Sequence, residues 1–233
     1  QTRETEIRTP LTTLGLADAV RELFHSVGSG LPRRAFSFHS PAGRCPVCKG
    51  SGHRRVAMDF MADLLLDCPS CQGTRFAPEV LTVRWRGLSV ADLLATQVSE
   101  LASLLPLGPL KKACQSLREV GLEHLSLGRP CHVLSHGEHQ RVLLAAALAE
   151  PGAGPGLFLL DEPGSGLHPR DLERVAQALH RLAERGSCVV YTTHRHRLID
   201  AAHWRVALGP GGGPDGGDLV DITDARLLVG GPT

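Results

Sequence analysis

The sequence has 233 residues, of which 42% are hydrophobic and 21% are charged, and its formal net charge is +1. A chain of this size builds one large domain or one domain with an insertion. Its near-neutral charge excludes a uniformly basic nucleic-acid coat, so contact with a polyanion requires a local patch. No apolar run approaches the roughly 20 residues that cross a bilayer, and we expect a cytoplasmic protein without membrane contacts.

The first half of the chain predicts short elements around a cysteine-rich segment. Residues 17–24 have the spacing of a short amphipathic helix, whereas residues 35–39 and 79–86 alternate as short strands. Two or three helices are predicted between residues 89 and 122.

The second half of the chain alternates helices and strands. We predict a helix over 138–150, an apolar strand over 157–160, a helix over 169–185, strands over 188–192 and near 204–208, and a glycine-rich loop over 209–217. Continuous apolar strands joined by helices are typical of a buried parallel α/β sheet.

Four of the seven cysteines form two Cys-x-x-Cys pairs separated by 19 residues, and they are Cys45, Cys48, Cys68 and Cys71. Each pair supplies two thiolates from one tight turn, and two pairs close a tetrahedral site that suits Zn²⁺. An odd number of cysteines indicates a reducing compartment and a metal, not a secreted disulfide framework. Four cysteines buried by chance and a redox Cys-x-x-Cys motif are the alternatives. We predict structural zinc.

Basic residues surround the first cysteine pair. No acidic residue occurs between Glu22 and Asp59, whereas six basic residues do: Arg33, Arg34, Arg44, Lys49, Arg54 and Arg55. Local positive charge is what contact with the phosphates of double-stranded DNA requires. A solvated basic surface is the alternative.

Two adjacent acids end the apolar strand predicted over residues 157–160. A strand in this position brings Asp161 near a nucleotide-bound Mg²⁺ and leaves Glu162 to polarise the attacking water. His194 follows the next predicted strand, and after such an acidic pair it is expected to sense the γ-phosphate of the nucleotide. The alternative for the two acids is a capping pair at a strand end.

Residues 134–141, Leu-Ser-His-Gly-Glu-His-Gln-Arg, open a predicted helix. Ser135 supplies a hydroxyl and Gly137 a bare amide, and the positive end of the helix dipole completes an anion site. An ordinary capping box formed by Ser135 and Glu138 is the structural alternative, and both roles are compatible.

Together these motifs resemble the ABC ATPase superfamily, and in particular the UvrA family of excision nuclease proteins. The resemblance covers nearly the whole chain in the family's order and rests on the cysteine spacing and on residues 10–15, 36–38, 43–45, 128–130, 134–141, 161–163, 166–168 and 208–210. It implies an α/β fold, a partial ABC-type ATPase lobe with a helical signature subdomain and an inserted four-cysteine zinc module, similar to the family's C-terminal half.

The resemblance also implies a division of the chain. Residues 1–43 would begin the signature and insertion region, 44–78 would form the zinc module, 79–150 the helical signature subdomain, and 151–233 the α/β lobe. It implies ATP with Mg²⁺ and Zn²⁺ as cofactors, with Ser135, Gly137 and Asp161 binding the nucleotide and with Glu162 and His194 catalytic.

ATP-dependent recognition of DNA damage in nucleotide excision repair is the function that the resemblance implies. The implied partners are double-stranded DNA, a helicase-like UvrB-type protein and a second copy of the full-length protein. Divergent UvrA-like ATPases in antibiotic resistance are one alternative. Another is a zinc-binding interaction module of the J-domain chaperone type, because residues 45–52 match the Cys-x-x-Cys-x-Gly-x-Gly repeat of such modules.

The sequence departs from the family pattern in four places. It contains no Gly-x4-Gly-Lys-Ser/Thr loop, which cradles nucleotide phosphates and which the family carries upstream of this segment. We therefore expect part of a longer product, inactive as an ATPase alone. His136 replaces the first glycine of the signature, Gly164 and Ser165 replace paired threonines, and Thr193 replaces an acid that often precedes the histidine.

Overall fold

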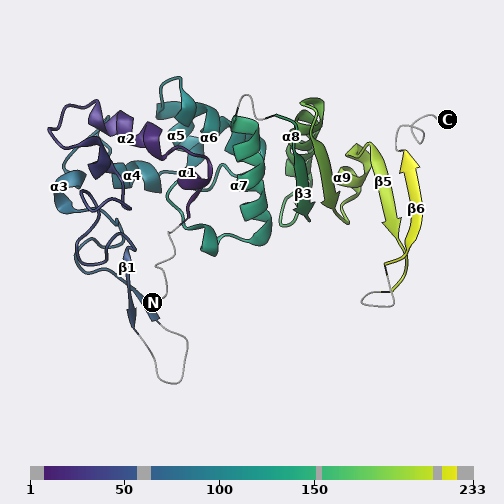
Figure 1. The fold of residues 1–233 in the computed structure, drawn as a ribbon, viewed down its shortest axis with the longest axis horizontal. Coiled ribbons are helices and arrows are strands. Elements are labelled where there is room, and N and C mark those ends of the chain that lie inside the picture. Colours follow the sequence, from purple (N-terminus) through teal and green to yellow (C-terminus); the bar gives the residue numbers. More distant parts are fainter. Residues whose placement is uncertain (1–7, 57–63, 151–153, 212–216, 225–233) are drawn as a thin grey trace. The chain divides into compact units, whose positions relative to one another are not determined.

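The computed structural model describes residues 8–56, 64–150, 154–211 and 217–224. The chain forms two compact units, Gln1–Gly152 and Ala153–Thr233. Figure 1 draws the first unit in purple to teal and the second in green to yellow.

The first unit is mainly helical, and its core consists of large side chains contributed by several helices. Those helices are α1 (Pro10–Thr13), α2 (Ala17–His25), α3 (Pro78–Leu81), α4 (Val90–Ala95), α5 (Val98–Leu104), α6 (Pro109–Glu119) and α7 (His136–Ala149), with 3-10 helices η1 (Arg33–Phe36) and η2 (Cys131–Val133). Phe24, Leu93, Leu101, Leu117 and Leu144 are almost completely buried. The predictions for residues 17–24 and for three helices before residue 122 are confirmed.

The strand predicted over residues 35–39 is wrong. The segment forms η1, which begins after Pro32 with a hydrogen bond of 2.8 Å from Ala35 N–H to Pro32 O. Ala35, Phe36 and Phe38 are all buried, and the Phe36 ring stacks on Phe24 with centroids 5.7 Å apart. Neighbouring residues are therefore buried together, which the alternation of a half-buried strand does not allow.

The strand predicted over residues 79–86 is also wrong. Residues Pro78–Leu81 form α3, because a proline fits the first turn of a helix and the buried Val80 and Val83 are three residues apart, as on one helix face. Trp85 and Leu88 then pair through two backbone hydrogen bonds of 2.9 Å around a tight turn, with positive φ at the two residues between them.

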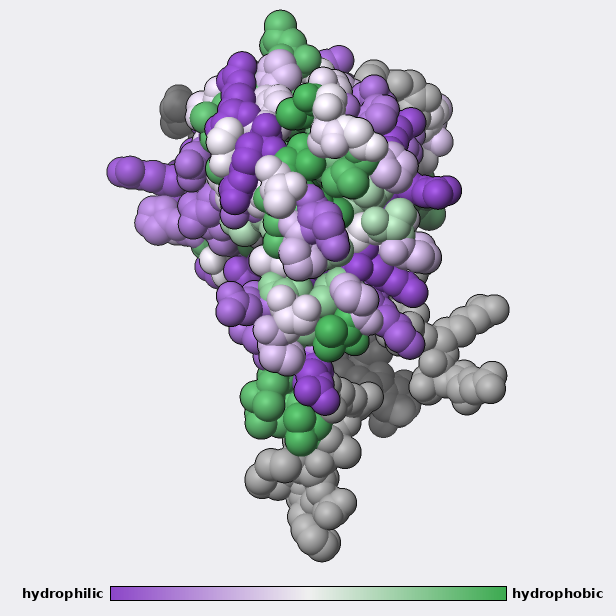
Figure 2. Space-filling view, turned by 90° about the vertical axis from the view of Figure 1, so that its left-hand side faces the viewer, coloured by the Kyte–Doolittle hydropathy of each residue, from purple (hydrophilic) through white to green (hydrophobic). Residues whose placement is uncertain are grey.

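A β-hairpin projects from the helical part of the first unit (Figure 1). Strands β1 (His53–Val56) and β2 (Leu64–Asp67) are antiparallel, with His53 opposite Asp67. The apolar side chains Val56, Leu64, Leu65 and Leu66 are between 41% and 58% exposed. Figure 2 shows apolar surface at this end of the unit. The sequence pattern does not predict this hairpin, because each of its two strands is only four residues long.

The second unit contains parallel and antiparallel strand pairs. Strands β3 (Leu157–Asp161) and β4 (Cys188–Thr192) are parallel and joined through α8 (Pro169–Glu184), which packs against β4 and α9 (His196–Ala201). Strands β5 (Trp204–Leu208) and β6 (Leu219–Asp224) form an antiparallel pair. The predicted β3, α8, β4 and β5 are confirmed, whereas β6 was not predicted.

The expectation that the apolar strand over residues 157–160 is buried holds only in part among the described residues. Leu160 is buried, but Leu157 and Leu159 are 64% and 69% exposed. Successive side chains of a strand point to opposite faces, and α8 packs against only one face of this pair of strands.

Among the described helices, none combines the length and the apolar composition that a bilayer crossing requires.

Candidate functional site

The four paired cysteines converge in the first unit. Their sulfur atoms all lie within 4.8 Å of one another, with 3.9 Å between Cys45 and Cys68 and 3.6 Å between Cys48 and Cys71. A tetrahedron with Zn–S bonds of about 2.3 Å has sulfurs about 3.8 Å apart. The four thiols therefore have the chemistry and the spacing that Zn²⁺ requires.

The two cysteine turns repeat one backbone conformation. Lys49 and Gly50 have φ of 52° and 91°, and Gln72 and Gly73 have φ of 48° and 82°. Each turn thus places two consecutive residues in the left-handed region, which brings backbone amides close to sulfur. Gly52 N–H donates to the Cys48 sulfur at 3.3 Å. Such N–H···S hydrogen bonds stabilise thiolate, the form that binds metal.

The cysteine pKa values indicate that the thiols share negative charge unequally. Burial raises the pKa of Cys45, but backbone hydrogen bonds from Cys48 and Val47 outweigh it and lower the value to about 6. Burial raises the pKa of Cys71 to about 12. One thiol ionises readily and another resists ionisation while its neighbours are charged, and a bound cation would relieve that resistance.

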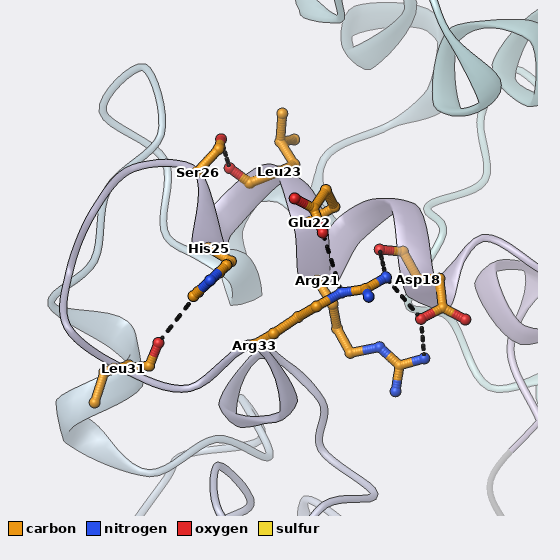
Figure 3. A network of polar contacts seen from close by, with 8 residues as sticks. All are labelled: Asp18, Arg21, Glu22, Leu23, His25, Ser26, Leu31 and Arg33. Carbon is orange, nitrogen blue, oxygen red and sulfur yellow. Dashed lines mark hydrogen bonds and ion pairs between the residues drawn. The ribbon is translucent and has the colours of Figure 1, made fainter.

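One arginine of the predicted basic patch, Arg33, is paired with acidic side chains in the structure. Arg33 contacts Asp18 at 2.9 Å and Glu22 at 3.2 Å, and Arg21 also contacts Asp18 at 2.7 Å (Figure 3). The network joins η1 to α2 and neutralises Arg33 locally. Four other basic residues of the predicted patch have described side chains: the exposed Arg34, Lys49 and Arg54, and the half-buried Arg44. The Arg55 side chain lies outside the described residues.

The strand-end acids and the expected histidine come together in the second unit. In the parallel register Asp161 lies opposite Thr192, whose hydroxyl donates to Asp161 Oδ1 at 2.5 Å. His194 Nδ1 lies 2.8 Å from Glu162 Oε1. Thr192 is not predicted from the sequence as a residue of this site, although the residue that ends the neighbouring parallel strand lies at the same sheet edge.

Glu162 has an unusual backbone conformation, and one of its carboxylate oxygens has no hydrogen-bond partner among the described residues. Its φ is 50°, which is uncommon for a residue other than glycine. Among the described residues, none hydrogen-bonds to its buried Oε2. A buried carboxylate oxygen without a partner fits a bound water or ligand, since burial without a hydrogen bond costs free energy.

Gly164 has a packing reason for replacing a larger residue. A Cβ added at Gly164 would lie 2.6 Å from Leu172 Cδ2 and 2.9 Å from Leu198 Cδ1. The turn after Glu162 therefore lies directly on α8 and α9, and the glycine is a packing requirement that leaves the acidic pair in place.

The signature segment forms the N-terminus of α7 in the first unit. Ser135 and Glu138 form a capping box: Ser135 N–H donates to Glu138 Oε2 at 2.9 Å, and Glu138 N–H donates to Ser135 Oγ at 3.2 Å. The capping role that was the alternative to an anion site is therefore present. His136 is the first helical residue and does not have positive φ, so it replaces glycine without backbone strain. Gly137 is buried. His124, which no sequence motif marks, contacts Glu138 at 2.9 Å and holds the carboxylate of the capping box in place.

Comparison with known proteins links this set of features to one family. The chain is 38% identical to UvrABC system protein A of Pseudomonas aeruginosa over 216 residues, which is 91% of this chain and 23% of that protein. For the Thermus thermophilus protein the identity is 37%, over 96% of this chain and 24% of that protein. The chain thus spans about a quarter of the length of these curated relatives.

Fold comparison agrees with the sequence comparison. The crystal structure of UvrA2 from Deinococcus radiodurans superimposes with a TM-score of 0.85 and 36% identity, over 99% of this chain and 29% of that chain. Residues 124–200 match the family model described as "AAA domain, putative AbiEii toxin, Type IV TA system". With its α/β lobe and its four-cysteine cluster, this chain is a UvrA-like member of the ABC ATPases.

Proposed function

We propose that this chain contributes one signature, one acidic strand end and one zinc module to an ATP-dependent protein that recognises damaged DNA for nucleotide excision repair. The observation that carries the proposal is the juxtaposition of Asp161, Glu162, Thr192 and His194 at one sheet edge of a UvrA-like fold. Parallel α/β sheets bind ligands at the carboxyl ends of their strands.

Each residue at this edge has a proposed task. Asp161, oriented by the Thr192 hydroxyl, would hold the cation of Mg-ATP, and Glu162 would orient water through the oxygen that has no partner among the described residues. His194 would position Glu162 and contact the terminal phosphate. Bound Mg-ATP supplies an activated phosphoanhydride, whose hydrolysis needs positioning and charge stabilisation more than covalent chemistry.

The signature would act on a nucleotide held by a phosphate-binding loop, which this sequence lacks. The Ser135 hydroxyl and the amides that follow it would face the terminal phosphate, favoured by the positive end of the α7 dipole. The capping box supports this role, because it fixes the first helical turn before any ligand binds.

The zinc module would carry the DNA contact. Its four sulfurs fit Zn²⁺, and the first cysteine pair is flanked in the sequence by Arg34, Arg44, Lys49 and Arg54, with no acidic residue between Arg34 and Arg54. Lysine and arginine contacts to phosphates dominate protein–DNA affinity. The UvrA resemblance adds a UvrB-type partner and a second copy of the full-length protein to the proposed assembly.

A segment exchange tests the proposal. In UvrA of Pseudomonas aeruginosa the matching segment is replaced by this sequence, and survival after ultraviolet irradiation is measured in a strain without its own UvrA. We expect the hybrid to restore survival and the hybrid with Glu162→Gln to fail. Equal survival with and without Glu162 would contradict the proposed role of the acidic pair, and a well-folded hybrid that never restores survival would contradict the repair function.

A further inference from the structure

In the second cysteine turn, Arg75 occupies the position that Gly52 occupies in the first. Gly52 follows Cys48 by four residues, and Arg75 follows Cys71 by four. Both have positive φ, 82° and 73°. Gly52 N–H donates to the Cys48 sulfur at 3.3 Å, and a backbone hydrogen bond from Arg75 acts to lower the pKa of Cys71. The two turns therefore match in backbone, and they differ in that one carries a large cationic side chain.

This arrangement costs free energy. Left-handed backbone is strained at a residue other than glycine, and a buried guanidinium loses hydration. Arg75 is 8% exposed, and among the described residues no carboxylate forms an ion pair with it. Burial lowers the pKa of Arg75, whereas the charges of Cys48 and Cys71 act in the opposite direction. Arg75 lies against both cysteine turns, so the thiolates of a metal-bound cluster are the negative charges that its guanidinium would meet.

The surrounding residues hold the Arg75 side chain in place. Its Cζ lies 5.1 Å from the centre of the Phe38 ring, a cation–π contact. A Cβ added at Gly52 would lie 3.1 Å from Arg75 Cγ and 3.5 Å from Nε, so the glycine of the first turn makes room for the arginine of the second. Arg75 O also accepts a hydrogen bond of 2.8 Å from Cys45 N–H. Arg75 therefore connects both cysteine turns.

We propose that Arg75 is the built-in counter-cation of the four-cysteine metal centre and controls how tightly the metal is retained. The inference rests on the proposed zinc site. Four thiolates around a divalent cation leave two negative charges, and the guanidinium of Arg75, a residue that is 8% exposed, would offset one of them. Residues that surround metal ligands change metal affinity about 10- to 100-fold when mutated.

The test compares zinc release from the 233-residue chain and its variants in excess chromogenic chelator. The variants are Arg75→Gln, Arg75→Gly, Arg75→Lys and the matched exposed control Arg118→Gln on α6. Arg75→Gly removes the charge and relieves the backbone strain, because glycine adopts positive φ readily. The first cysteine turn already has glycine, Gly52, at this position. Co²⁺ absorption of each variant reports whether four thiolates still bind in a tetrahedron.

We expect Arg75→Gln and Arg75→Gly to release zinc at least about 10-fold faster than the parent, with Arg75→Lys and Arg118→Gln close to the parent. Parent-like release from Arg75→Gly overturns the inference even if Arg75→Gln fails to fold. Release from Arg75→Lys as fast as from Arg75→Gln also overturns it, because packing and not charge would then be responsible. A parent chain that binds no zinc refutes the metal site itself, which is a separate result.

Discussion

The Nδ1 atom of His194 lies 2.8 Å from Oε1 of Glu162, and the two residues follow neighbouring parallel strands. The contact leaves the other carboxylate oxygen of Glu162 without a partner among the described residues, in the position of an acceptor for water. This geometry fits the roles proposed for the pair, Glu162 as general base and His194 as the group that orients it.

Replacing Glu162 with glutamine should lower ATP turnover of the UvrA hybrid by at least about 100-fold, because an amide cannot accept the proton of the attacking water. His194→Ala should cause a similar loss with nucleotide binding retained. Phosphate release measures turnover, and a fluorescent ATP analogue measures binding. Glu173→Gln on α8 is the control and should remain active. Turnover unchanged by Glu162→Gln would remove Glu162 from the reaction.

The purified chain should contain about one zinc per molecule, because four thiolates complete one tetrahedral site. Cys68→Ser should abolish retention and destabilise the first unit, since metal binding and folding are coupled. Elemental analysis and thermal unfolding with and without chelator measure both effects. Cys188→Ser is the control, since Cys188 is exposed on β4 and outside the cluster. Full zinc content in Cys68→Ser would refute the site.

Arg54 and Arg33 should differ in their effect on DNA binding by the hybrid. Arg54 is exposed on β1, whereas Arg33 is already paired with Asp18 and Glu22. Arg54→Gln should weaken binding and reduce the salt slope by about one, as expected for one lost phosphate contact. Arg33→Gln should leave the slope unchanged. Fluorescence anisotropy at several salt concentrations measures it, and identical slopes for the parent and Arg54→Gln would exclude the contact.

Glu138 should stabilise α7 in a pH-dependent way. Burial raises the pKa of Glu138, but its hydrogen bonds with His124 and Ser135 prevail and hold it below the ordinary 4.5. A lowered folded-state pKa gives stability that is present above pH 4.5 and is lost as pH falls through the folded value.

Glu138→Gln should therefore cost about 1 kcal/mol near pH ~7 and progressively less below pH ~4.5. Denaturant unfolding of the parent and the variant at each pH measures the difference, and Glu150→Gln at the other end of α7 provides the comparison. A difference that grows as the pH falls below ~4.5 would show that the carboxylate is not the stabilising form.

Gly164→Ala should destabilise the second unit by about 1–3 kcal/mol, since the added Cβ meets Leu172 and Leu198 at less than 3 Å. Trp204 fluorescence in a Trp85→Phe background reports unfolding of this unit. At Gly154 an added Cβ meets nothing within 4 Å, so Gly154→Ala should be nearly neutral. Equal stability of the two variants would show that the turn moves away from α8 and α9.

Some parts of this structure can be predicted from the sequence because they depend on residues that lie close together in the chain. The spacing of Cys45, Cys48, Cys68 and Cys71 predicts their convergence, because two short turns that bind one metal leave few other arrangements. Ser135 and Glu138 predict the start of α7 because a capping box forms within a single turn. Strand β3 and helix α8 are evident because their apolar patterns extend over several residues.

Only the tertiary structure decided the features that depend on distant partners. Residues 35–39 alternate like a strand, but packing of Phe36 on Phe24 and burial of Ala35 favour a 3-10 helix. Pairing of Arg33 with Asp18, and of Thr192 with Asp161, joins residues separated by 15 and 31 positions. The sequence therefore determined which groups are present and which short-range turns they form, whereas long-range packing decided which charges are neutralised and which remain for a ligand.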